Sequence, residues 1–370
     1  MQLSQLLLAQ IQTGIAALLL QLSALLGLGV ISISAVSLPL STSGNSVLAW
    51  RFWQRVSAAL GQTAGALGLL WLTVLALAWP QLLARLGSVM GPVLVTAGLL
   101  AYATAGLARY GLASSHTVFR WFVWVVSSLC YLVVVCLIVV AQSWMREPSG
   151  VALIDGRFQV TDWAGVLLNP HFGLQLAIAI ACAFVLACVL MLALNARLKA
   201  QDVSFAFGLR WQRSLGALGV LACLGLILLM EPLASWWVTT APAMPNLLSG
   251  QITQTGATLA AQVIFLTLII CLIRFVRELF RAEGGVDPRA RRMQSLGFLF
   301  AALLSGSLWS LVEGSKGEQL VAGLPVADLV STQSVWILFA GLVVVALLSV
   351  MAVWQLKCRV RHALSMAQQP

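Results

Sequence analysis

Nine long runs of apolar residues constrain this chain more than any other feature. A helix needs about 20 predominantly apolar residues to cross ~30 Å of hydrocarbon. A membrane span must also satisfy its own backbone hydrogen bonds, so each run is expected to be helical. We therefore predict an all-α polytopic membrane protein in which residues 1–370 form one integral membrane domain, with nine transmembrane helices at about 14–38, 56–78, 86–107, 122–143, 173–196, 215–230, 258–273, 294–312 and 335–356.

The composition excludes a water-soluble fold. Of the 370 residues, 61% are hydrophobic and 9% are charged, and the mean hydropathy is +0.98. A soluble protein of this size would have too little polar surface to cover its core.

The positive charges alternate along the chain and predict its orientation. The segments after the first, third, fifth, seventh and ninth spans hold 17 Lys and Arg residues, whereas the N-terminus and the other segments hold 4. Under the positive-inside rule, the N-terminus lies outside and the C-terminus lies in the cytoplasm. This pattern accounts for the net charge of +10, so no nucleic-acid partner is expected. The first 50 residues carry no charged side chain and so lack the basic region of a cleavable signal peptide.

The cysteines and histidines suggest neither a disulfide framework nor a metal centre. Six of the seven cysteines fall inside predicted spans, and the chain has no Cys-x-x-Cys-His motif for covalent haem attachment. No group of His, Cys, Asp and Glu has the spacing of metal ligands, so no metal site is expected.

The segment SWMREPSG at 143–150, followed by LLNP at 167–170, resembles the boundary between the fourth and fifth membrane helices of cytochrome bd quinol oxidase subunit I. That family has Gly-Trp-Met-x-x-Pro-x-Gly at this place. Ser143 replaces the first glycine, and the matching residues are Trp144, Met145, Pro148 and Gly150. Shorter similarities follow the family's order at RFWQR (51–55), MGP (90–92) and SFAFGLRWQRSLG (204–216).

The resemblance implies a fold of two four-helix bundles plus one helix in a bacterial or archaeal cytoplasmic membrane. Catalytic members of the family bind three haems and oxidise quinol. The resemblance implies axial haem ligands in spans one, five and seven, and haem iron requires a donor such as imidazole, thioether, thiolate or carboxylate. Here the matching positions are Leu18 to Leu20 in span one and Ile178 in span five, and no methionine occurs between Met244 and Met293.

The expected proton and quinol sites also differ. The family has a pair of glutamates in the third helix, and the matching positions here are Thr96 and Thr104. No Asp or Glu occurs before Glu147, so the first four predicted spans contain no carboxylate. The family's long hydrophilic quinol-binding loop after the sixth helix is replaced by a short, nearly uncharged segment that begins MEPLAS.

Three residues stand as candidates for cofactor binding. Trp309 and Glu313 keep the four-residue spacing of a Trp and a haem-contacting Glu in the family, which places them on one helical face. His171 lies at the outside start of span five and could ligate a displaced haem, opposite Glu313. A solvated helix end for Glu313 and a polar helix cap for His171 are the alternative interpretations.

The sequence thus favours a non-catalytic, subunit I-like partner in a cytochrome bd-type quinol:oxygen oxidoreductase complex. Such a chain would scaffold a haem-bearing bd-type subunit I or another membrane subunit, in contact with lipids. No cofactor is expected on the chain alone, while haem b or d would belong to the complex. The first alternative is a redox-active subunit with reduced or non-family haem ligation, and a weaker one is a lipid or quinone carrier on the same scaffold.

Overall fold

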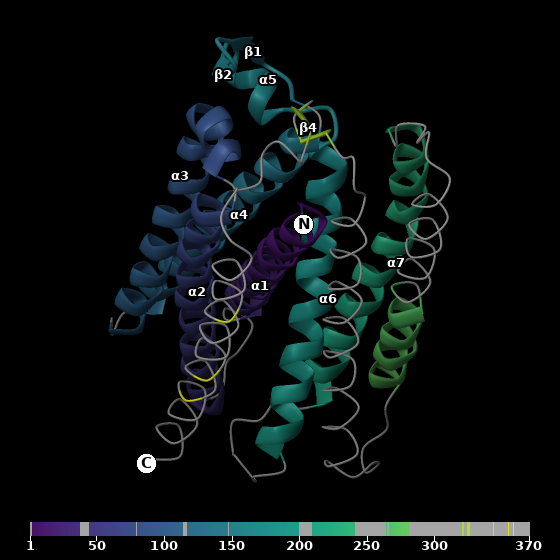
Figure 1. The fold of residues 1–370 in the computed structure, drawn as a ribbon. Coiled ribbons are helices and arrows are strands. Elements are labelled where there is room, and N and C mark those ends of the chain that lie inside the picture. Colours follow the sequence, from purple (N-terminus) through teal and green to yellow (C-terminus); the bar gives the residue numbers. More distant parts are fainter. Residues whose placement is uncertain are drawn as a thin grey trace.

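A computed structural model of the chain shows long helices, most of which run roughly side by side (Figure 1). The structure describes residues 2–37, 44–78, 80–113, 117–146, 148–199, 209–240 and 266–280, with isolated positions at 264, 320–321, 324–325, 343, 354 and 358.

The first four helices form a closed four-helix bundle. They are α1 (Gln2–Ser37), α2 (Gly44–Ala78), α3 (Pro80–Ala113) and α4 (Thr117–Arg146). Each packs against the next along the chain, and α1 also packs against α4, which closes the ring. The connections are short, so neighbouring helices run in opposite directions, whereas α2 and α4 lie diagonally and run in the same direction (Figure 1).

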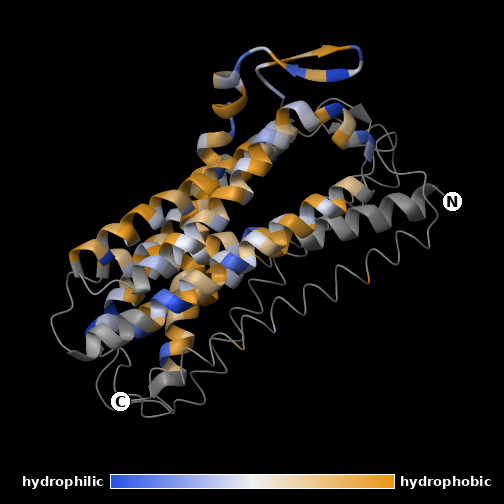
Figure 2. Cartoon of the chain, turned by 90° about the vertical axis from the view of Figure 1, so that its left-hand side faces the viewer, coloured by the Kyte–Doolittle hydropathy of each residue, from blue (hydrophilic) through white to orange (hydrophobic). Residues whose placement is uncertain are grey.

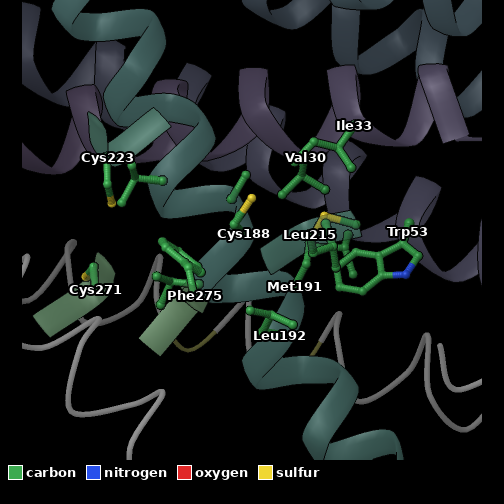
Figure 3. Close-up of a cluster of buried hydrophobic side chains, with 14 of the residues drawn as sticks. Val30, Ile33, Trp53, Cys188, Met191, Leu192, Leu215, Cys223, Cys271 and Phe275 are labelled. Atoms are coloured by element: carbon green, nitrogen blue, oxygen red, sulfur yellow. The ribbon is translucent and has the colours of Figure 1, made fainter. Parts of the chain in front are cut away.

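A second group of helices packs against the other side of α1. It contains α6 (Phe172–Lys199), α7 (Leu209–Thr240) and the helical residues 266–279. Helix α6 contacts α1, α4 and α7. A buried apolar cluster joins this group to α1 and α2, and Figure 3 shows Val30 and Ile33 on one side of it and Cys223, Cys271 and Phe275 on the other.

Glycines allow the closest helix contacts, as expected where lipid gives no hydrophobic drive for helix association. A Cβ at Gly219 of α7 would lie 2.6 Å from the Phe275 ring, and one at Gly216 would lie 3.0 Å from the Phe275 carbonyl oxygen. On α1, a Cβ at Gly29 would lie 2.6 Å from the Ala187 Cβ of α6.

The first six predicted spans are confirmed as long apolar helices. Six segments are long and apolar enough to cross a membrane, namely Leu18–Val36, Phe52–Val74, Leu83–Leu107, Val118–Met145, Trp163–Ala196 and Arg210–Leu229. Residues 266–279 are helical and overlap the predicted span at 258–273. The predicted spans at 294–312 and 335–356 lie outside the described residues, apart from positions 343 and 354.

The helices extend beyond the predicted spans because apolar runs mark only the hydrocarbon-crossing part. Helix α2, for example, begins at Gly44 rather than 56 and includes Arg51 and Arg55. Figure 2 shows that most of the coloured helix ribbon is hydrophobic. Large apolar side chains are exposed on these helices as well as buried in the core, including Leu99, Phe122, Leu129, Leu221 and Ile273. Such a surface suits contact with lipid.

Two short hairpins are the extended elements among the described residues. Strands β1 (Val151–Ile154) and β2 (Arg157–Val160) pair antiparallel, followed by the short helix α5 (Trp163–Leu167). Strands β3 (Leu320–Val321) and β4 (Leu324–Pro325) form the other pair. The all-α prediction thus holds for the membrane-spanning part, while the segment between α4 and α6 contains a β-hairpin (Figure 1).

Candidate functional site

The connection between α4 and α6 is anchored by Trp144. This indole is fully buried, and its Nε1 donates a hydrogen bond to the Ser149 carbonyl oxygen at 3.0 Å. The Phe158 ring meets it edge to face, with centroids 5.7 Å apart at 84°. The hydroxyl of Ser143, which stands at the position of the family's glycine, donates to the Val140 carbonyl oxygen at 3.1 Å. The tryptophan of the motif therefore holds the start of the connection against the bundle.

Gly150 makes the turn that this connection requires. Its φ is +70°, a conformation that L side chains rarely adopt, and a Cβ there would lie 2.8 Å from the Val166 backbone nitrogen. The Gly150 carbonyl oxygen accepts from the backbone N–H groups of Thr161 and Asp162, each at 3.0 Å. The Ser149 hydroxyl donates to the Gly165 carbonyl oxygen at 2.6 Å. This glycine thus joins the end of α4 to the start of α5.

Asp162 caps α5. Its carboxylate accepts from the backbone N–H groups of Ala164 at 2.9 Å and Gly165 at 3.0 Å. Side-chain oxygens at this position satisfy the unpaired N–H groups of a helix start. An Asp directly before Trp-Ala-Gly is a signal for such a cap, although the sequence interpretation above did not use it.

Asn169 and His171 form the start of α6. Asn169 is buried, and its Oδ1 accepts from the backbone N–H of His171 at 3.0 Å. The His171 carbonyl oxygen accepts from the Gln175 N–H at 3.1 Å, so His171 is the residue that caps the helix. Its side chain is half-buried. The backbone of His171 therefore lies directly before α6, and both roles of its side chain, as a polar cap and as a haem ligand, stay predictions.

The hairpin between α4 and α5 has a recognisable turn. Asp155 and Gly156 have φ values of 50° and 73°, as a two-residue hairpin turn requires. The hydroxyl of Ser88 in α3 donates to the Phe158 carbonyl oxygen, which ties β2 to the bundle. The Asp-Gly pair between apolar residues could have predicted this hairpin from sequence.

The positions where the resemblance implies haem ligands in spans one and five carry apolar side chains. Leu20 of α1 packs against the buried cluster around Trp144 and Val89. Ile178 of α6 packs against the cluster that contains Phe275 and Cys188. Neither side chain has a lone pair for iron, so neither can serve as an axial haem ligand.

The two threonines on α3 differ in their surroundings. Thr104 is fully buried, and its hydroxyl donates to the Leu100 carbonyl oxygen of its own helix at 2.7 Å. Thr96 is exposed on the outer face of α3. A hydroxyl that is bonded within its own helix does not supply the acid–base group that a carboxylate would.

Trp309 and Glu313 lie outside the described residues, so the structure does not test whether they approach His171. Among the described residues, no three His, Cys, Asp or Glu side chains gather in a way that could hold a metal ion.

Residues 266–279 contain an ion pair that sequence reasoning did not single out. Arg274 and Glu278 are 3.0 Å apart, one helical turn from each other, and both side chains are nearly inaccessible. The i, i+4 spacing of opposite charges was the available signal. The backbone at Glu278 lies close to α7, because a Cβ at Gly216 of α7 would lie 3.5 Å from the Glu278 carbonyl carbon.

A family model and solved structures match this chain. Residues 8–230 match the family described as cytochrome bd terminal oxidase subunit I. Among curated proteins, no match was found. Among solved structures, the chain is similar to "The structure of bd oxidase from Geobacillus thermodenitrificans", with a TM-score of 0.81, 13% identity, and 98% of each chain covered. At this identity the structural likeness concerns the fold alone.

Proposed function

This chain belongs to the cytochrome bd terminal oxidase subunit I family, and on that premise we propose that it is a non-catalytic member that scaffolds a haem-bearing subunit. Members of this family work in membrane complexes with other subunits. The proposed partner is a haem-bearing bd-type subunit I or another membrane subunit, with lipid around the pair. The chain would then contribute helix surface rather than redox chemistry.

The main observation behind this proposal is a retained scaffold without the expected donors. The α1–α4 bundle and the Trp144 connection carry the family's architecture. Yet Ile178, at the position where the resemblance implies a haem ligand in span five, has a hydrocarbon side chain that packs against an apolar cluster. At Thr104 the hydroxyl is used within α3. A haem or a proton relay of the family's kind needs donors at these places.

Haem spectroscopy tests this proposal directly. The full chain would be purified in detergent, both alone and with any membrane partner that co-purifies, and haem would be quantified by reduced-minus-oxidised spectra and pyridine haemochrome. We expect no haem on the chain alone and b- and d-type bands in the complex.

Stoichiometric haem on the isolated chain would overturn the scaffold proposal. If that haem disappeared in His171→Ala or Glu313→Ala, the chain would be a redox subunit with rebuilt ligation. Asn169→Ala is a useful control, because it removes the side chain that holds the His171 backbone while leaving the imidazole in place.

The proposed orientation places the N-terminus outside and the C-terminus in the cytoplasm. Its support is the 17 to 4 division of Lys and Arg between alternate connections. Alkaline phosphatase and green fluorescent protein would each be fused to the C-terminus. We expect fluorescence and no phosphatase activity; the reverse pattern would invert the topology.

A further inference from the structure

Four polar side chains inside the α1–α4 bundle lack a hydrogen-bond partner in the part of the chain that the structure describes. They are Gln54 and Ser57 of α2 and Ser127 and Tyr131 of α4, each at most 1% exposed. For Gln54, both the amide nitrogen and the amide oxygen lack a partner. The bundle therefore holds several unpaired donors and acceptors in its interior.

These four side chains lie along one column of the bundle. A Cβ on Gly61 of α2 would meet the Tyr131 hydroxyl of α4, so these two residues lie at the same level. Ser57 lies four residues before Gly61 in α2, and Ser127 lies four residues before Tyr131 in α4. The two helices run in the same direction (Figure 1). One turn of helix brings the two serines to the next level on the same interior face. Gln54 extends the column by three more residues.

The Tyr131 ring is fixed at the end of this column by glycines on both sides. A Cβ at Gly27 of α1 would lie 2.7 Å from the Tyr131 Cε1, and the ring's hydroxyl reaches Gly61. Close contacts on both sides hold the hydroxyl inside the bundle rather than toward lipid.

An unpaired polar group in a low-dielectric interior is costly. Lipid cannot supply hydrogen bonds from outside the bundle, so the missing partner must lie within it. The groups in this column both donate and accept, and none of the four carries a charge. These properties match water, which bridges buried polar groups through two to four hydrogen bonds.

We propose that ordered water molecules occupy the interior of the α1–α4 bundle and bridge Gln54 and Ser57 of α2 to Ser127 and Tyr131 of α4. The water joins two diagonal helices whose polar side chains do not pair directly. Because no Asp or Glu precedes Glu147, helices α1–α4 contribute no carboxylate to this column. The inference is independent of the proposed scaffold role.

Radiolytic footprinting tests for the bound water. X-ray pulses turn ordered water into hydroxyl radicals that oxidise the adjacent side chain, and ¹⁸O-water identifies the source of the oxygen. We expect Tyr131 to be oxidised in the full chain in nanodiscs. Phe275 is the control, because its fully buried ring lies against Gly219 in an apolar cluster. Oxidation of Tyr131 no greater than that of Phe275 would overturn the proposal.

The sign of a stability change gives a second, independent test. If water satisfies the hydroxyls, Ser127→Ala and Tyr131→Phe each remove a hydrogen bond and lower the Tm, by about 2 °C or more. If the column is dry, the same changes remove an unpaired group and leave the Tm unchanged or raised, which would contradict the proposal. Ser143→Ala is the matched control on α4, because the Ser143 hydroxyl bonds within its own helix.

Discussion

Tyr131 and Gly61 form a paired contact across the diagonal of the α1–α4 bundle, in which the phenol hydroxyl occupies the space where any other residue at position 61 would place its Cβ. A tyrosine inside a membrane bundle and a glycine on a helix are each unremarkable when read separately. Their contact sets how closely α2 and α4 approach.

Gly61→Ala is expected to destabilise the chain by about 1–3 kcal/mol, because the new methyl group overpacks the contact with the Tyr131 hydroxyl. In a Tyr131→Phe background the same change should cost less, since the next atom, Cζ, lies 3.1 Å from the Cβ position. Thermal unfolding of the two single variants and the double variant in detergent measures this coupling. Strict additivity would show that the contact is not formed.

Gly219→Ala should also destabilise, by about 1–3 kcal/mol, because its Cβ would lie 2.6 Å from the Phe275 ring of residues 266–279. Gly225→Ala on the same helix is the control, since nothing lies within 4 Å of its Cβ position. There the loss of backbone freedom should stabilise α7 by about 0.5–1 kcal/mol. Equal unfolding temperatures for the two variants would contradict the close approach of α7 and residues 266–279.

Gly150→Ala and Gly156→Ala separate backbone strain from steric conflict. Both glycines have positive φ values, but a Cβ at Gly150 would press on the backbone of Val166, whereas Gly156 faces open space. Gly156→Ala should therefore cost about 1 kcal/mol from strain alone. Gly150→Ala should lower the free energy of unfolding by clearly more than Gly156→Ala does. It should also make residues 147–168 more accessible to limited proteolysis. Indistinguishable cleavage rates in the two variants would argue against the packed turn.

Because Arg274 and Glu278 form a buried ion pair, we expect the chain to lose more stability when one partner is removed than when both partners are replaced. Glu278→Leu leaves the Arg274 guanidinium without its carboxylate and should cost about 3–5 kcal/mol. Arg274→Met combined with Glu278→Leu should recover most of that loss. The comparison is made by unfolding temperature in one detergent, and a double variant as unstable as Glu278→Leu alone would count against a buried ion pair.

The sequence predicted the first six membrane helices well, because hydrocarbon requires long apolar runs and those runs are visible in a single chain. It did not predict where the helices end. Helix α2 continues back to Gly44 through Arg51 and Arg55, because a helix does not have to end where its apolar run ends.

The segment that carries the family motif was recognised, but its internal structure was not. The Asp155-Gly156 turn and the Asp162 cap each have a local sequence signal, but a search for long apolar runs does not detect such signals. The partner of Tyr131 could not have been predicted at all, because the register between two helices depends on the packing of the whole bundle. The same reason explains why His171 was identified as a candidate while its cap geometry at Asn169 was not.

The bond from Ser88 to the Phe158 carbonyl oxygen and the contact of the Phe158 ring with buried Trp144 attach the β1–β2 hairpin to α3 and α4. Its tip at Leu153 to Asp155 is exposed and stands beyond the end of the bundle (Figure 1). An antibody fragment raised against that tip would therefore serve as a rigid fiducial in electron microscopy. The fragment would give the particle a landmark that reports the orientation of the helices beneath it.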